Sequence, residues 1–332
     1  MSQEHHDYSA HDLGQSLEDL STLGQNLITQ LSRVVLGQEA VITEAFIAMI
    51  SGGHILLEGP PGVGKTFMLK SLAKTSGLGM KRVQCTPELM PSDILGGYRL
   101  LQSTEGPQLK FHQGPIFTQI FFADEINRAT PRTQSALLEA MGEGQVSIEG
   151  EINILPKPFL LVATQNPLDH EGTYPLPEAQ SDRFFFKSLS HHPSEPILDR
   201  LLDFDANAAF EQLQVLCSTH QIQAWSQASA QIPLNPRTRQ KLLEILMKSR
   251  PQNLSPNLST LLMDGLSLRA ARELYRACQV HAALKGRLVA NDDDLKRCIF
   301  PAVRHRLRLS WQAKSNQVNV DELVSELCKG IL

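Results

Sequence analysis

The chain has 332 residues, more than the roughly 250 to 300 at which a single hydrophobic core stops growing, so we expect at least two domains. Hydrophobic residues make up 42% and charged residues 20%, and the formal net charge is -4, a balance that excludes long disordered or collagen-like segments. The sequence contains no run of about 20 uncharged apolar residues and no N-terminal basic region followed by an apolar one, so we predict a cytoplasmic protein.

The N-terminal part of the chain shows two different patterns. Residues 1–31 are polar with only a sparse leucine periodicity, so we expect an N-terminal arm that is loose or weakly helical. The amphipathic run at 39–50 predicts a helix, and Gly52 and Gly53 after it are typical of a helix C-terminus. The period of the pattern changes after this point.

Five short apolar runs predict strands, and helical or irregular segments separate them. Strands that alternate with crossover segments favour a mostly parallel sheet covered on both faces. We therefore expect an α/β domain over residues 32–190. Its predicted strands lie at 54–57, 81–85, 120–123, 159–163 and 184–186.

Two segments between these runs carry clear local signals. Residues 130–141 predict a helix, because Pro131 suits the first turn and Gly142 follows as a stop residue. Residues 144–158 alternate apolar and polar side chains about Glu149-Gly150, which is typical of a β-hairpin.

The strand signals end after about residue 192, and Leu, Ala, Gln and Arg dominate the remaining sequence. Helical patterns occupy 238–247, 268–284 and the residues from Asp292, for which Asn291 is an N-cap candidate. We therefore expect a connecting segment at 191–234 and an all-α second domain at 235–332. A late basic cluster is interpreted as a solvated helix face rather than a nucleic-acid site, because the whole chain is slightly acidic; its members are Lys296, Arg297, Arg304, Arg306 and Arg308.

The segment GPPGVGKT matches the G-x-x-x-x-G-K-[ST] pattern of a phosphate-binding loop, and it lies between a predicted strand and a predicted helix. Its glycines let backbone N–H groups turn toward phosphate oxygens, and the helix N-terminus adds partial positive charge. We expect Lys65 to reach the β and γ phosphates and Thr66 to donate its hydroxyl oxygen to Mg²⁺. The predicted nucleotide-binding residues are Gly59, Pro60, Pro61, Gly62, Val63, Gly64, Lys65 and Thr66.

The strand predicted at 120–123 delivers Asp124 and Glu125 to its C-terminal end, the edge at which ligands bind in open α/β sheets. Asp124 is expected to organise the Mg²⁺ shell, and Glu125 to orient and deprotonate an attacking water. Two carboxylates at a strand end can alternatively form structural salt bridges. Together with the phosphate loop, the pair predicts nucleotide hydrolysis.

Three further polar residues are candidates for contact with phosphate. Asn166 ends the run FLLVATQN and can hydrogen-bond the attacking water and the γ phosphate, although an Asn before Pro is often a turn residue. Arg183, on the next short predicted helix, and Arg269, at the start of a helix in the second domain, can stabilise transition-state charge or pair with surface carboxylates. The residues alone leave these alternatives open.

The combination of GPPGVGKT, FFADEINRATPRTQSALLEAMGEGQV, VATQNPLDHEGTYPLPEAQSDRF and HRLRL resembles the MoxR branch of the AAA+ ATPases over about residues 34–309. The resemblance implies a P-loop NTPase α/β domain with strand order 5-1-4-3-2, a helical lid, and assembly as a ring that is usually a hexamer. It assigns Walker A to 59–66, Walker B to 120–125, sensor 1 to Asn166, the arginine finger to Arg183 and sensor 2 to Arg269.

The resemblance also covers two insertions and one switch residue. Residues 91–115 resemble the family's helix-2 insert, and 144–158 resemble its hairpin before sensor 1. Gln84 stands where related ATPases place a polar residue that can hold the catalytic Glu. Two positions depart from the family pattern: Leu268 replaces the Pro that usually precedes the sensor 2 Arg, and Ser181 replaces an apolar residue before DRF.

The resemblance implies Mg²⁺-dependent ATP hydrolysis in a homo-oligomeric ring that remodels or matures a client or adaptor protein, such as a von Willebrand factor A domain protein or a metalloenzyme. A DNA-remodelling AAA+ ATPase is disfavoured, because the net charge is -4 and no helix-turn-helix or zinc module is visible. A nucleotide-gated scaffold with slow turnover stays open. A P-loop GTPase is disfavoured because no NKxD sequence follows the Walker motifs.

Overall fold

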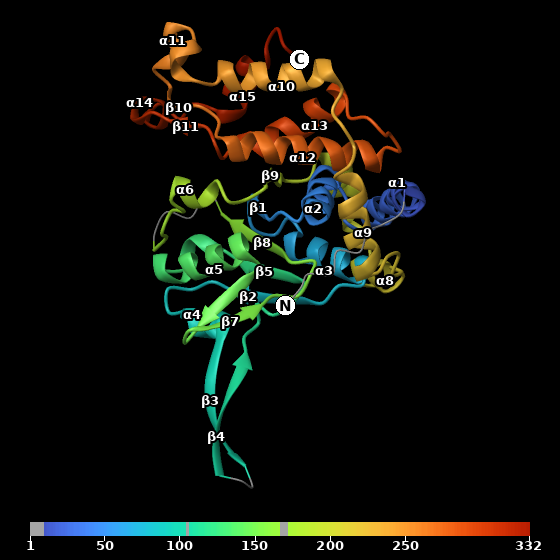
Figure 1. The fold of residues 1–332 in the computed structure, drawn as a ribbon, viewed down its shortest axis with the longest axis vertical. Coiled ribbons are helices and arrows are strands. Elements are labelled where there is room, and N and C mark those ends of the chain that lie inside the picture. Colours follow the sequence, from blue (N-terminus) through green and yellow to red (C-terminus); the bar gives the residue numbers. More distant parts are fainter. Residues whose placement is uncertain (1–9, 104–105, 167–171) are drawn as a thin grey trace. The chain divides into compact units, whose positions relative to one another are not determined.

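The computed structural model describes residues 10–103, 106–166 and 172–332. The chain divides into two compact units. We call Leu31–Gln214 the α/β unit, and the residues up to Gln30 together with Val215–Leu332 the helical unit. The division after Gln214 falls within the connecting segment expected at 191–234. Figure 1 shows the elements with the labels used below.

The α/β unit is built on a five-stranded sheet whose four pairings are all parallel. Its strands, in order across the sheet, are β2 (Met80–Gln84), β5 (Ile120–Asp124), β8 (Leu160–Gln165), β1 (Ile55–Glu58) and β9 (Phe186–Leu189). Numbered by their order along the chain, these five strands follow the order 5-1-4-3-2, which confirms both the predicted strands and the predicted topology.

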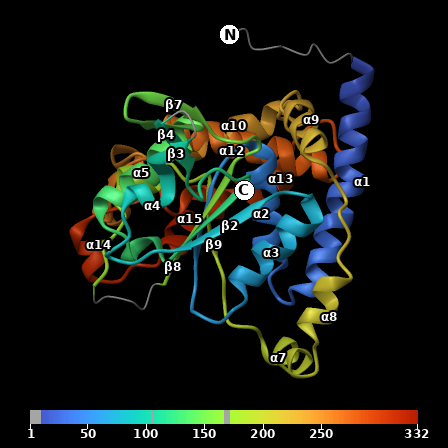
Figure 2. The same cartoon turned by 90° about the horizontal axis from the view of Figure 1, so that it is seen from below.

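The inner strands are continuous apolar runs because helices and loops cover both faces of the sheet. All four residues from Ile120 to Ala123 are fully buried. On one face, alternating side chains of β5 and β8 form a single core cluster with α4 (Pro91–Leu95) and α5 (Pro131–Glu143). The other helices of the unit are α2 (Glu39–Ser51), α3 (Lys65–Ser76), the 3-10 turn η1 (Ile126–Arg128), α6 (Glu178–Ser181), α7 (Glu195–Leu202) and α8 (Ala206–Glu211), and Figure 2 shows α7 and α8 in succession.

The sequence predicted the C-terminus of α2 correctly but not that of α5. Helix α2 closes at Gly52, which has φ 70°, as expected. Helix α5 does not stop at Gly142 but continues to Glu143 and closes at Gly144, which has φ 62° and whose N–H bonds the Ala140 carbonyl. The prediction of the α5 end was wrong because either glycine can close a helix, and only the chain's exit toward the next strand selects one.

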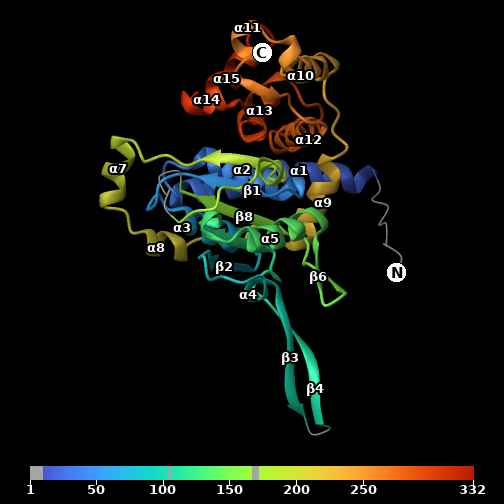
Figure 3. The same ribbon diagram turned by 90° about the vertical axis from the view of Figure 1, so that its left-hand side faces the viewer.

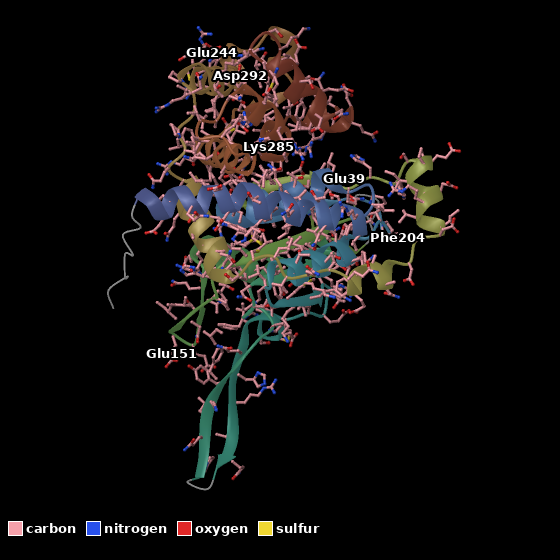
Figure 4. The ribbon with its side chains drawn as sticks, turned by 90° about the vertical axis from the view of Figure 1, so that its right-hand side faces the viewer. Glu39, Glu151, Phe204, Glu244, Lys285 and Asp292 are labelled. Atoms are coloured by element: carbon pink, nitrogen blue, oxygen red, sulfur yellow. The ribbon has the colours of Figure 1, made fainter. Side chains whose placement is uncertain are left out.

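Two antiparallel hairpins extend from the α/β unit. Strands β6 (Gln145–Ile148) and β7 (Glu151–Ile154) form the hairpin predicted at 144–158, with positive φ at Glu149 and Gly150 in its two-residue turn. Strands β3 (Gly96–Ser103) and β4 (Gly106–Gln113) form a longer one, seen projecting in Figure 3. The Tyr98 hydroxyl donates a hydrogen bond to the carboxylate of Glu151, labelled in Figure 4, so the hairpins contact each other.

No strand pattern was visible in the sequence of β3 and β4, although their pairing covers eight residues on each side. Neither strand contains Val, Ile or Thr, and both begin with glycine. Strand propensity reflects packing of β-branched and aromatic side chains on a pleated surface, and these strands carry few of them. The pairing of β3 with β4 could therefore not be predicted from the sequence pattern.

The helical unit contains most of the remaining helices, together with one small two-stranded sheet. Strand β10 (Leu262–Asp264) pairs with β11 (Arg308–Leu309), and neither is long enough to produce a period-two pattern. The Asn291 side chain caps α13 in a capping box with Asp294, as predicted. The helices are α9 (Thr219–Ser229), α10 (Pro236–Lys248), η2 (Pro251–Asn253), α11 (Pro256–Ser259), α12 (Leu268–Leu284), α13 (Asp292–Val303), α14 (Trp311–Ser315) and α15 (Val320–Cys328).

The segment expected as a loose or weakly helical arm is, from Ala10 onward, the 25-residue helix α1 (Ala10–Val34). Its fully buried residues Leu20, Leu27 and Leu31 are spaced so that they lie on one helix face. The Gln25 side chain donates a hydrogen bond to the Leu284 carbonyl at 2.6 Å, which joins α1 to the end of α12. A sparse leucine stripe is therefore sufficient for an ordered helix.

The late basic cluster differs from the solvated face that composition suggested. The Arg306 side chain is 1% exposed and pairs with Glu273. Arg304 pairs with Asp321 at 2.9 Å, and Arg308 lies 3.7 Å from Asp264. The interpretation as a solvated face was wrong for Arg306, because carboxylates brought from other helices make its burial possible.

Among the residues that the structure describes, no helix has the length and apolar character needed to traverse a lipid bilayer.

A buried histidine fixes the start of β1, the strand that leads to the phosphate loop. The Nδ1 atom of His54 accepts from the Leu161 N–H at 3.0 Å, and its Nε2 lies 3.0 Å from the Met141 carbonyl, to which it can donate as the neutral tautomer. Burial lowers the pKa of His54 from 6.5 to about 4, because the charged form would lose its hydration. His54 is therefore neutral in the folded protein above about pH 4.

The protein should lose stability on mild acidification through His54. Its folded pKa lies below its unfolded value, so the unfolded chain binds more protons between pH 6.5 and 4, and the free energy of unfolding falls over that interval. Protonation of His54 accounts for a fall of about 3 kcal/mol in the free energy of unfolding. Urea unfolding at several pH values should show a smaller fall for His54→Gln, whereas a control variant at the exposed His220 should follow the wild type. Parallel curves for His54→Gln and wild type would contradict this assignment.

Candidate active site

The loop between β1 and α3 has the backbone geometry of a phosphate-binding turn. Gly62 and Gly64 have φ values of 79° and 85°, in the left-handed region that favours glycine. Gly64 is the N-cap of α3, so the helix begins at Lys65. A Cβ on Gly59 would lie 2.3 Å from the Ser190 carbonyl oxygen, so the close approach of these two segments also requires glycine.

Lys65 follows this loop, and its side chain reaches back to the start of the loop. Its Nζ donates a hydrogen bond to the Gly59 carbonyl at 2.7 Å. Burial lowers the pKa of Lys65, and the nearby carboxylates of Asp124, Glu125 and Glu58 oppose that shift. The carboxylates therefore stabilise the protonated form of Lys65 at a site that is partly shielded from water.

Most of the residues predicted from the sequence line one cavity of about 360 Å³. They come from three places in the chain: the phosphate loop, the end of β5 and the end of β8. Because the strands are parallel, their carboxyl ends meet at the same sheet edge. The lining residues are Pro61, Gly62, Gly64, Lys65, Thr66, Phe67, Asp124, Glu125, Thr164 and Asn166.

Thr164 was missed by sequence reasoning, although it lies just two residues before Asn166. Its hydroxyl donates to Asp124 Oδ1 at 2.5 Å and accepts from the Glu125 N–H at 2.8 Å. A single side chain of β8 therefore positions both acidic residues at the end of β5. The signal was available in principle, because a buried threonine at a strand end needs partners for its hydroxyl group.

The backbone of Glu125 is held in a conformation that is uncommon for a residue with a side chain. Its φ and ψ are 57° and 52°, in the left-handed region. Such a conformation costs on the order of 1–3 kcal/mol and persists where surrounding contacts impose it. The hydrogen bond from the Glu125 N–H to Thr164 is one such contact. The geometry turns the chain sharply after β5, directly at the proposed catalytic carboxylate.

Both carboxylates also contact side chains on their other oxygen atoms. Asp124 Oδ2 accepts from Arg82 Nη2 at 2.7 Å and from Arg82 Nε at 3.1 Å. Glu125 Oε2 accepts from Gln84 Nε2 at 2.9 Å and lies 2.9 Å from Arg128 Nε. The contact of Gln84 with Glu125 is the one that the sequence suggested for a switch residue. The sequence analysis missed Arg82 and Arg128, which stand two residues before Gln84 and three residues after Glu125.

Arg183, one of the two candidate arginines, does not line the 360 Å³ cavity. Arg183 was predicted to lie on α6, but it lies two residues beyond the end of that helix. Its Nη1 donates to the Leu138 carbonyl at 2.6 Å. Arg269 is the second residue of α12 in the helical unit, as predicted. The roles of both residues in phosphate chemistry stay predictions.

A second cavity of about 150 Å³ shares Gly62, Gly64 and Phe67 with the first. Most of its other lining residues are apolar: Val34, Val35, Leu36, Val63, Pro193, Leu201, Phe204 and Ala206, with the side chain of Gln38 among them. A nucleotide has a flat, largely apolar base beside a charged phosphate chain, so an apolar cavity next to the phosphate loop fits one. The sequence did not indicate this cavity, because its residues come from α1, α7, α8, the loops beside them, and the phosphate loop with the start of α3.

The donor set at this site fits Mg²⁺ shared with phosphate oxygens. Thr66 and Asp124 both line the 360 Å³ cavity and offer the hard oxygen ligands that Mg²⁺ prefers. Among the described residues, no group of three or more His, Cys, Asp or Glu side chains is arranged to hold a metal alone. Mg²⁺ usually binds through one or two protein groups, substrate phosphates and water.

Known proteins resemble this chain along most of its length. The family model for the ATPase family associated with various cellular activities matches residues 54–186, and the AAA lid domain model matches 263–327. The uncharacterised protein YeaC of Bacillus subtilis is 36% identical, covering 95% of this chain and 96% of the relative. Chaperone MoxR1 of Mycobacterium tuberculosis is 33% identical, covering 92% and 81%. A solved structure of a candidate ATPase from Cytophaga hutchinsonii has a TM-score of 0.84 and 30% identity, covering 95% and 96%.

Replacing Thr164 by valine should weaken Mg²⁺-dependent nucleotide binding. The substitution keeps the side-chain shape but removes the hydroxyl that fixes Asp124 Oδ1 and the Glu125 backbone. Loss of such an outer-shell contact typically lowers metal affinity about tenfold to hundredfold. A Mg²⁺ titration with a fluorescent nucleoside diphosphate measures the change, and Thr164→Ser should retain most of the affinity. Equal Mg²⁺ dependence in Thr164→Val and wild type would show that the hydroxyl does not support this site.

Proposed function

Because this chain belongs to the MoxR family of AAA+ ATPases, we propose that it hydrolyses ATP with Mg²⁺ in a cytoplasmic homo-oligomeric ring, and that turnover remodels or matures a partner protein. The observation that carries the hydrolysis proposal is the shared cavity. The phosphate loop, two carboxylates and Asn166 meet there at one sheet edge, as nucleotide hydrolysis requires.

Each side chain in the cavity has a distinct task in this reaction. The loop N–H groups and Lys65 bind the β and γ phosphates. Thr66 and Asp124 hold Mg²⁺, which neutralises charge on the phosphate oxygens when bound. Glu125 orients a water molecule and accepts its proton, while Asn166 hydrogen-bonds the same water and the γ phosphate.

The ring proposal concerns Arg183 and Arg269. Arg183 is exposed and does not line the cavity of its own chain, which supports a role as an arginine finger toward a neighbouring subunit. A ring, most simply a hexamer, brings such a residue to each active site. Arg269, at the start of α12, contacts the nucleotide of its own chain as sensor 2 in this proposal.

The client is a protein in this proposal, such as a von Willebrand factor A domain protein or a metalloenzyme in maturation. One relative is named as a chaperone, which supports this class of activity. The two hairpins offer apolar side chains for protein contacts: Leu100, Leu109, Ile152 and Ile154 are all more than 60% exposed. A DNA-remodelling role is less well supported, because the net charge is -4 and three arginines of the late basic cluster form ion pairs with carboxylates.

Two substitutions separate nucleotide binding from turnover. Lys65→Ala should abolish nucleotide binding, since the loop loses its positive side chain. Glu125→Gln should bind ATP but lose turnover, because an amide cannot accept the proton of the attacking water. Equilibrium binding and phosphate release on the same preparations test both. Wild-type turnover in Glu125→Gln would remove Glu125 as the base, and turnover that is very slow in the wild type would favour the nucleotide-gated scaffold.

Mixing two inactive variants tests whether Arg183 acts across a subunit interface. Arg183→Ala should bind ATP but hydrolyse it poorly, and Glu125→Gln should not hydrolyse it. In mixed rings, an intact Glu125 in one subunit can face an intact Arg183 from its neighbour, so part of the activity should return. No recovery in rings shown to contain both variants would mean that Arg183 does not act in trans.

Affinity capture identifies the class of client. Glu125→Gln with ATP and Mg²⁺ should retain a protein partner from native lysate that Lys65→Ala does not retain. Selective capture of a von Willebrand factor A protein or a metalloenzyme supports the maturation role. Enrichment of nucleic acid instead would move the chain to the DNA-remodelling class.

A further inference from the structure

The edge strand β2 carries two polar side chains toward the acidic end of β5. Arg82 and Gln84 are two residues apart on β2, so they lie on the same face of the sheet. The parallel register places Arg82 beside Phe122 and Gln84 beside Asp124. Figure 1 shows β2 and β5 as neighbours. The strand therefore presents a guanidinium and an amide to the two catalytic carboxylates.

Arg82 contacts two partners with the same guanidinium group. Its Nη2 donates to Asp124 Oδ2 at 2.7 Å and to Gln84 Oε1 at 2.7 Å, and its Nε adds a second hydrogen bond to Asp124 Oδ2. The side chain is 45% exposed, whereas Asp124 is 15% exposed. A charge pair at this depth is partly shielded from solvent, so its geometry matters more than that of a surface pair.

The contact with Arg82 fixes which end of the Gln84 amide faces Glu125. Guanidinium groups only donate hydrogen bonds, and carboxylates only accept them. With Oε1 toward Arg82, the amide Nε2 faces Glu125 Oε2 and donates to it at 2.9 Å. The flipped amide would place donor against donor and acceptor against acceptor. Arg82 thus determines that Gln84 can hold the proposed catalytic base.

We propose that Arg82 is a positioning residue that couples cation binding at Asp124 to release of Glu125. This inference rests on the proposed function, in which Asp124 holds Mg²⁺. Arg82 donates to Oδ2 of that carboxylate. When Mg²⁺ is bound, the interaction of Arg82 with Asp124 weakens, because the two cations compete for the same carboxylate. When Arg82 withdraws, the Gln84 amide loses its orienting donor, and its hold on Glu125 weakens.

Arg128 supplies a useful contrast, because it holds Glu125 from the other side. Its Nε lies 2.9 Å from the same Oε2 atom, three residues along the chain. Arg82 itself donates hydrogen bonds to Asp124 and Gln84 rather than to Glu125. Arg82 therefore acts on the base only through Gln84, and this gives the proposal a test that a merely structural arginine would not satisfy.

The first measurement is the Mg²⁺ dependence of nucleotide binding. In Arg82→Gln, the competing cation is gone, so the Mg²⁺ concentration at half-maximal binding of fluorescent ADP should fall about threefold to tenfold. The matched control is Lys81→Gln, which removes the same charge from an exposed neighbour on the opposite face of β2. An Mg²⁺ midpoint in Arg82→Gln equal to that of the control would overturn the proposal.

The second measurement is a double-mutant cycle on kcat. Arg82→Gln and Gln84→Ala should each raise basal kcat about fivefold, because Gln84→Ala removes the hydrogen bond to Glu125 and Arg82→Gln removes the donor that orients the Gln84 amide for that bond. The double variant should match the single variants, since Arg82 acts through Gln84. If the kcat of the double variant rises by the product of the two single effects, or if either substitution lowers kcat, the coupling is overturned.

Arg82→Lys separates the two contacts and serves if Arg82→Gln does not fold. Its ammonium can stay at Asp124, but it lacks the planar fork that also reaches Gln84. It should keep the Mg²⁺ midpoint near the wild-type value while raising kcat as Gln84→Ala does, and the opposite pattern would contradict the proposal. If wild-type protein binds Mg²⁺ and nucleotide without turnover, the proposed ATPase fails, whereas the Mg²⁺ midpoints still decide whether Arg82 competes at Asp124.

Discussion

The hydroxyl group of Thr164 joins the ends of two neighbouring parallel strands, and the candidate active site depends on that link. It donates to the carboxylate of Asp124 and accepts from the backbone of Glu125, whose left-handed conformation turns the chain away from the sheet. The parallel register of β5 and β8 makes this contact possible, and β1, on the other side of β8, brings the phosphate loop to the same edge. One hydroxyl thereby holds the Asp124 carboxylate and the Glu125 backbone.

A second layer of contacts surrounds those acidic side chains. Arg82 and Gln84 approach from the edge strand β2, and Arg128 from the turn after β5. A charged donor pairs with each carboxylate: Arg82 with Asp124, and Arg128 with Glu125. The proposed reaction therefore requires an exchange of partners, because in it Asp124 leaves Arg82 to bind a metal ion and Glu125 leaves Gln84 and Arg128 to bind a water molecule.

The two units differ in how they use charge. In the α/β unit, Arg82 of β2 pairs with Asp124, and Arg128 of η1 pairs with Glu125. In the helical unit, arginines near the end of the chain pair with carboxylates from α12, α15 and β10. Arginine thus lines a candidate active site in one unit and joins packed elements in the other. Composition does not distinguish these two uses, so it wrongly suggested that Arg306 is solvated.

The sequence by itself determined the five sheet strands, the phosphate loop, the acidic pair after β5 and the cap at Asn291, because these depend on local periodicity and on motifs with fixed spacing. Only the tertiary structure decided which of two glycines ends α5, that β3 and β4 pair, and that Arg82, Arg128 and Thr164 contact the acidic pair. Those features join residues that no short pattern links: Arg82 and Asp124, for example, are 42 positions apart and meet through strand register. The physical reason is that hydrogen-bond partners are selected by position in space, whereas sequence patterns record only neighbours along the chain.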